Sequence, residues 1–63
     1  MTDEVLFEII RKGNAMQVSA VHVATNTEVS VMGPAAASPM ALQEAALRKL
    51  KYVLAKKKSE GTK

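Results

Sequence analysis

The chain has 63 residues, of which 48% are hydrophobic and 24% are charged, and its formal net charge is +3. This length allows one domain, and the mixed composition is typical of a folded chain rather than a disordered one. The chain has no cysteine, which excludes disulfide bonds and thiolate metal sites. Because so small a core supplies only about 3–5 kcal/mol of net stability, self-association is the means of stabilisation that remains.

The positive charge is concentrated in the second half of the chain. Residues 1–33 carry four acidic and two basic side chains, a net −2, whereas residues 34–63 carry seven basic and two acidic ones, a net +5. The acidic start lacks the basic and apolar regions of a secretory signal. No apolar run approaches the roughly 20 residues that span a bilayer. We therefore expect a cytoplasmic protein with no membrane attachment.

Three segments predict β-strands. Residues 5–11 are rich in β-branched and aromatic side chains, which suit a pleated surface. Residues 16–23 and 28–32 alternate between apolar and polar positions. Between these segments, the pairs Gly-Asn at 13–14 and Thr-Asn at 25–26 are candidates for tight turns. The order of strands and turns predicts an antiparallel meander.

The register follows if each turn is a two-residue loop. The first hairpin then pairs Phe7 with Ala20. In the second hairpin Ala20 faces Val31, and His22 faces Val29. Both hairpins place Ala20 on one apolar face, and a one-residue slip in either would reverse every side chain. The predicted inner face consists of Val5, Phe7, Ile9, Met16, Val18, Ala20, Val29 and Val31, with His22 near one end.

The remaining residues predict one long helix. Ser38 suits the N-cap position and Pro39 the first helical position. An apolar stripe then continues at helical spacing to about Lys57. A helix of about 18 residues is roughly 27 Å long, so it covers strands of roughly 23 Å from end to end. The stripe consists of Leu42, Ala46, Leu50, Val53 and Leu54.

These elements predict an α+β fold of βββα type, in which a three-stranded antiparallel meander of order 1-2-3 packs on one long C-terminal helix. Residues 1–58 are expected to form this single domain, followed by a disordered tail at residues 59–63.

Seven runs spread over nearly the whole chain carry a family resemblance. They are EVLFEIIR (4–11), GN (13–14), VSA (18–20), TEVS (27–30), GP (33–34), AALRKL (45–50) and YVLAK (52–56). In these runs the chain resembles a family of short alphaproteobacterial proteins of unknown function. The resemblance implies a bacterial cytosolic protein. It carries no established activity or catalytic residue that could be transferred.

Catalysis is not predicted. A nucleophile needs a base within hydrogen-bond reach, but the single histidine, His22, is predicted on the sheet face opposite Ser19 and Ser30. The glycines stand apart from one another, so no phosphate-binding loop is present. We predict no enzymatic activity, cofactor, metal site or small-molecule ligand. His22 is expected to be a half-buried residue at the end of the sheet, with a pH-sensing role as the alternative.

The outer face of the sheet is the first candidate contact surface. Four apolar side chains are predicted there, with Glu8 and Ser19 between them, and exposed apolar clusters mark contact surfaces. We expect a small binding or scaffold domain that acts by protein–protein contact, as a homodimer or with an unknown protein partner. The predicted interface residues are Leu6, Ile10, Val21 and Val23.

The basic end of the helix is the second candidate. It predicts, as the alternative function, an accessory nucleic-acid-binding or ribosome-associated protein with salt-sensitive binding. This alternative is not favoured, because the exposed sheet face lacks the basic and aromatic residues of sheet-based RNA readers. A solvated cationic helix end explains the same residues. They are Arg48, Lys49, Lys51, Lys56, Lys57 and Lys58.

Overall fold

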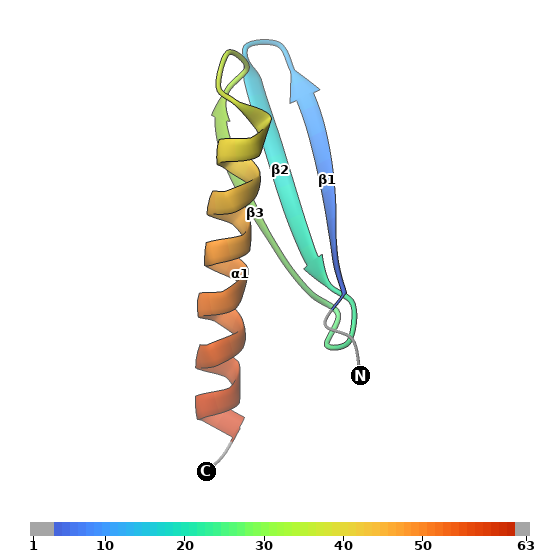
Figure 1. The fold of residues 1–63 in the computed structure, drawn as a ribbon, viewed down its shortest axis with the longest axis vertical. Coiled ribbons are helices and arrows are strands. Elements are labelled where there is room, and N and C mark those ends of the chain that lie inside the picture. The colour runs from blue at the N-terminus through green and yellow to red at the C-terminus, as the bar shows by residue number, and fades with distance from the viewer. Residues whose placement is uncertain (1–3, 62–63) are drawn as a thin grey trace.

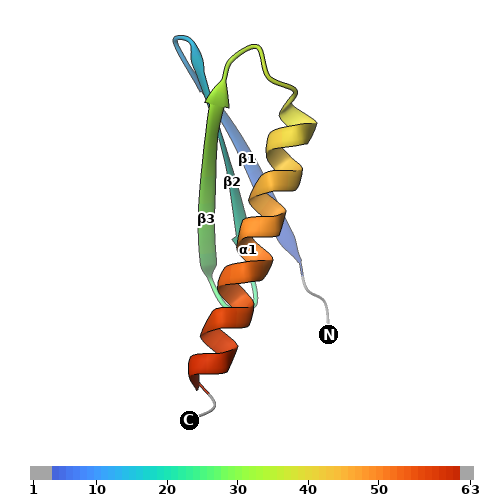
Figure 2. The ribbon, with the colours of Figure 1, turned by 90° about the vertical axis from the view of Figure 1, so that its left-hand side faces the viewer.

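A computed structural model describes residues 4–61, with side chains to residue 57. In chain order it contains strands β1 (Val5–Lys12), β2 (Ala15–His22) and β3 (Thr27–Pro34) and helix α1 (Pro39–Gly61). The strands form one antiparallel sheet in the order β1-β2-β3 (Figure 1). The helix packs against one face of the sheet, which gives two layers (Figure 2). The predicted βββα fold is confirmed.

The first hairpin has the predicted register. Phe7 pairs with Ala20, and Lys12 pairs with Ala15 across a two-residue loop. Gly13 occupies the first loop position with a φ of +56°, a backbone conformation that a residue with a Cβ rarely adopts. Glycine at this position is typical of a tight hairpin turn whose twist matches that of the strands.

The second hairpin differs from the prediction by two residues. Ala20 pairs with Val29 instead of Val31, and His22 pairs with Thr27 instead of Val29. The connection is therefore a four-residue turn, residues 23–26, rather than a two-residue loop. Asn26 lies in the left-handed region with a φ of 56°, which asparagine tolerates better than most residues. Because side chains alternate with a period of two, a shift of two residues keeps every side chain on its predicted face.

The core lies between β2, β3 and the helix. Six apolar side chains are buried there, and the largest of the fully buried ones are Met16, Leu50 and Val18. Burial of each of these three side chains stabilises the fold by about 1.5–3 kcal/mol. The predicted inner face and helix stripe supply all six. They are Met16, Val18, Ala20, Val29, Ala46 and Leu50.

The helix covers β2 and β3 but leaves the inner face of β1 largely open. It makes its main contacts with those two strands, and Figure 1 shows β1 at the edge of the sheet away from α1. Val5 and Phe7 pack against the border of the core. Ile9, predicted to belong to the core face, is 46% exposed. The prediction compared the helix with the strands in length only. Across the width of the sheet, α1 leaves the β1 side of the inner face open, so Ile9 does not join the core face as predicted.

The helix begins as predicted and continues further than predicted. The Ser38 Oγ accepts a hydrogen bond from the Ala41 amide at 3.4 Å, and Pro39 is the first helical residue. This is the arrangement of an N-cap followed by proline. The helix runs to Gly61, so it includes residues 59–61 of the expected tail. The last two residues of that tail lie outside the described part of the chain.

Candidate interaction surfaces

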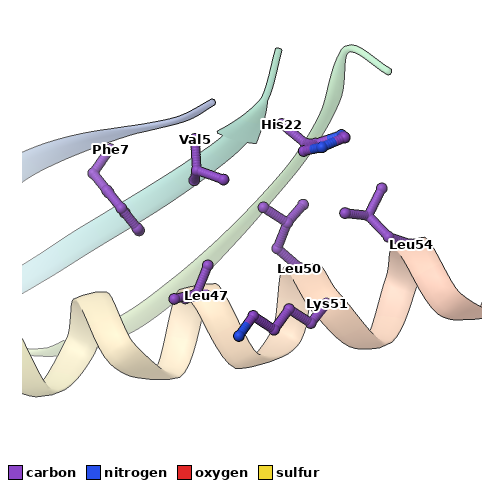
Figure 3. A pocket seen from close by; sticks show the side chains of 7 residues that line it. All are labelled: Val5, Phe7, His22, Leu47, Leu50, Lys51 and Leu54. Carbon is purple, nitrogen blue, oxygen red and sulfur yellow. The ribbon is translucent and has the colours of Figure 1, made fainter. Parts of the chain in front are cut away.

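An apolar groove runs between β1 and α1, where the helix leaves the sheet open. One part of it is a cavity of about 370 Å³. A hollow of about 250 Å³ continues it toward the start of the helix, and the two share Phe7 and Leu47. Figure 3 shows Val5 and Phe7 pointing from β1 toward the helix, and Leu50 and Leu54 pointing from the helix toward the sheet. We call this surface the β1–α1 groove.

The charged side chains of the β1–α1 groove come from the helix. Lys51 lines the larger cavity and Glu44 lines the hollow, and both side chains are exposed. The aliphatic stem of Lys51 extends along the helix surface (Figure 3), so its apolar part belongs to the groove while its ammonium group reaches water. His22 and Gln43 are the other polar lining residues. Such a lining suits an apolar occupant with few charges.

The outer face of the sheet is exposed and only partly apolar. Leu6 and Val21 are register partners, and Leu6 is 52% exposed. Val23 lies in the turn after β2, where its amide donates a hydrogen bond to the Glu4 carbonyl at 3.1 Å. These predicted interface residues therefore gather at one end of the sheet. Ile10, the fourth, pairs with Gln17 near the other end.

A polar row separates the two ends of the outer face. Glu8 pairs with Ser19, and Ser19 pairs with Ser30, so the row crosses all three strands. Leu6 and Ile10, on either side of it, are four residues apart, or roughly 13 Å along an extended strand. The predicted interface therefore consists of two apolar clusters with the Glu8 carboxylate between them.

The predicted basic cluster is divided between two sides of the helix. Lys49 Nζ donates a hydrogen bond to the Ser30 carbonyl at 3.1 Å, and Lys57 Nζ donates one to Thr27 Oγ1 at 3.2 Å. Both thus hold the helix to β3. Arg48 and Lys51 instead line a hollow on the helix surface together with Glu44 and Leu47. Lys56 is exposed, and the side chain of Lys58 lies outside the described part of the structure.

A chain of hydrogen bonds joins His22 to the helix. His22 Nδ1 lies 2.8 Å from Thr25 Oγ1, and Thr25 Oγ1 lies 2.8 Å from Thr27 Oγ1, which accepts the bond from Lys57. His22 is 8% exposed and Thr27 is 5% exposed. His22 is therefore more buried than expected, and its ring takes part in joining the turn of the second hairpin to the later part of α1.

Within residues 4–57, where side chains are described, no three His, Asp or Glu side chains come together as a metal site. No helix in the described part of the chain combines the length and apolarity needed to cross a bilayer. The described surface has two apolar areas, one on each face of the sheet: the β1–α1 groove on the inner face and the clusters of exposed side chains on the outer face.

Two parts of these surfaces lie outside the predicted sites. Met32, which the alternation of the third strand places on the outer face, is 68% exposed there and pairs with Gln17 beside Ile10, but it is not among the predicted interface residues. In the β1–α1 groove, Met40 and Leu47 line the hollow, although neither was expected to form a site. A signal for the groove does exist in the sequence, since Met40, Leu47 and Leu54 are seven residues apart and therefore lie on one side of a helix.

The fold and its surfaces define a class, that of very small βββα domains with a single helix and exposed apolar area on both sheet faces. Residues 2–57 match the sequence model of a family described as "Domain of unknown function (DUF6898)". The match covers most of the chain, and the protein belongs to this family. No curated protein and no solved structure matches it. The predicted membership of a family of unknown function is thus confirmed, while the alphaproteobacterial origin stays a prediction.

Proposed function

We propose that this protein is a small binding or scaffold domain that acts by protein–protein contact and self-associates through its outer sheet face. The observation that carries the proposal is the exposure of large apolar side chains on a face that no described element covers. Leu6 is 52% exposed and Met32 is 68% exposed, at opposite ends of that face. Exposed apolar area of this kind marks contact surfaces in small domains.

The thin core supports the same proposal. Six apolar side chains are buried, and a chain of this size gains only about 3–5 kcal/mol of net stability from its own core. A partner that binds the folded form alone adds to this stability by mass action. Contact with a second copy therefore adds to the small net stability of the single folded chain.

A charge at Val21 tests the outer face. Val21 is half-buried beside Leu6, so Val21→Glu places a carboxylate in the larger apolar cluster while the core side chains stay unchanged. We expect the variant to have a lower molar mass in solution than the wild type and the same circular dichroism spectrum. Ala36→Glu adds the same charge at an exposed loop position and serves as the control. An unchanged mass for Val21→Glu contradicts the proposal.

We also propose that the protein is not an enzyme. The only histidine is engaged with Thr25 at 2.8 Å and lies on the sheet face opposite Ser19 and Ser30, so no serine and base are arranged as a catalytic pair among the described residues. This arrangement supports a binding role for the domain over a catalytic one.

Nucleic-acid binding is the second candidate function. Arg48, Lys51 and Lys56 are exposed cations on the helix, which favours contact with phosphates. Glu44 lies beside the first two in the same hollow, which weakens the attraction. This candidate predicts binding to mixed RNA or DNA that falls steeply with added salt, and binding that is absent or insensitive to salt removes it.

A further inference from the structure

We propose that the β1–α1 groove is a second self-association surface, in which the helix of another copy lies antiparallel to α1 about a two-fold axis near Leu47. This contact goes beyond the proposed function, because it uses the opposite face of the sheet and does not require the outer face. The proposal depends on the spacing of the helix residues, their charges, and the open inner face of β1.

The helix has a second stripe beside the one that packs on the sheet. The buried stripe follows Leu42, Ala46, Leu50 and Val53. The second stripe faces the β1–α1 groove or its rim and repeats with steps of four and three residues, the spacing of a helix that packs side by side with another helix. We call it the open stripe, and it consists of Met40, Glu44, Leu47, Lys51 and Leu54.

The apolar positions of the open stripe are exposed enough to receive a partner. Met40 is 69% exposed, and Leu47 and Leu54 are half-buried. In an antiparallel pair centred on Leu47, the Met40 of one copy lies near the Leu54 of the other, and the two Leu47 side chains meet at the axis. An isologous contact of this type needs one self-complementary surface, which these three positions provide.

The charges of the open stripe select the antiparallel arrangement. Glu44 lies three residues before Leu47 and Lys51 lies four residues after it, which corresponds to roughly 4.5 and 6 Å along the helix axis. A two-fold axis near Leu47 therefore brings each Glu44 close to a Lys51 of the other copy, twice per pair. A parallel arrangement would place like charges together, which is unfavourable. The stripe is thus complementary to itself in one orientation only.

The inner face of β1 completes the surface. Phe7 lines both the cavity and the hollow of the groove, and Ile9 is 46% exposed on the same face of the strand. Packed helices lie about 8–10 Å apart, and a two-fold axis between antiparallel helices leaves both sheets on the same side of the helix pair. The β1 strands of the two copies would then lie on either side of this axis. Their exposed inner-face side chains would adjoin the contact between the helices.

Two single variants separate this contact from the outer-face contact. Leu47→Glu introduces a charge at the proposed axis, and Val21→Glu introduces one on the outer face. Molar mass is measured by light scattering for both variants and the wild type at the same chain concentration. We expect Leu47→Glu to lower the mass. If Val21→Glu alone lowers it, the proposed function stands and the groove contact is wrong. If Leu47→Glu alone lowers it, the groove contact stands without the outer-face contact.

A charge exchange tests the orientation without touching an apolar residue. Glu44→Lys places lysine near the Lys51 of the other copy and is expected to weaken association about tenfold. The double variant E44K/K51E restores opposite charges across the axis and is expected to return the dissociation constant to within about twofold of the wild type. Both positions are exposed, so the monomer fold should tolerate the changes. A double variant as weak as Glu44→Lys, or weaker, overturns the antiparallel contact.

Discussion

Gly33 of β3 lies directly against Leu42 of α1, so that a Cβ on Gly33 would stand 2.9 Å from a Leu42 δ-carbon. Gly33 pairs with Met16 of β2, a fully buried residue of the core. The absence of a side chain at position 33 thus creates the space in which the first turns of the helix approach the sheet.

Gly33→Ala should destabilise the fold by about 1 kcal/mol, because the Leu42 side chain must move to admit the added methyl group. In a Leu42→Ala background the same substitution should be neutral, since the space is then free. Urea unfolding of the four proteins gives the coupling energy between the two positions. Additive effects of the two substitutions would show that the close approach has no energetic consequence.

Gly13→Ala should cost about 1 kcal/mol for a different reason. A Cβ at Gly13 meets nothing within 4 Å, so the cost comes from the backbone, whose φ of +56° is unfavourable for a residue with a side chain. Gly13→Asn should cost less than Gly13→Ala, because asparagine tolerates this conformation. Thermal unfolding at a fixed chain concentration checks the order, and an alanine variant as stable as the asparagine variant contradicts it.

Thr27→Val should destabilise the fold by about 1–2 kcal/mol. Its hydroxyl lies within hydrogen-bond distance of both Thr25 and Lys57 and is buried, so valine keeps the volume while its partners lose their bonds. Thr25→Val is the matched comparison. Thr25 is exposed, so water can replace its bonds and its loss should cost less. A Thr27→Val variant as stable as the wild type would argue against a structural role for this hydrogen-bond chain.

The faces of the strands could be predicted from the sequence, whereas two spatial details could not. Alternation places Val18 and Ala20 on the inner face whatever the length of the second turn, because a shift of two residues changes partners without changing faces. The turn length itself depends on the left-handed conformation of Asn26, whereas the residue types at 25–26 predict a shorter, two-residue loop. Periodicity therefore determines the core but not the register of the second hairpin.

The lateral position of the helix is the second detail, and it determines the candidate site. The stripe through Ala46 and Leu50 shows which side of the helix meets the sheet, but not which strands lie beneath it. Three strands with a spacing of about 4.8 Å occupy roughly 14 Å of sheet width, whereas a helix is about 10 Å across, so one helix does not cover all three strands. The exposure of Ile9 and the groove beside Leu47 follow from that difference in width.

The central claim is that this domain works by contact with another protein surface, beginning with a second copy of itself. The most direct test is the molar mass in solution, measured by light scattering after size exclusion at low and high salt over a range of chain concentrations. The account predicts a mass of at least twice the 6.8 kDa of the single chain, retained at high salt because the contacts are mainly apolar. A mass of one chain at every concentration and salt level would contradict it.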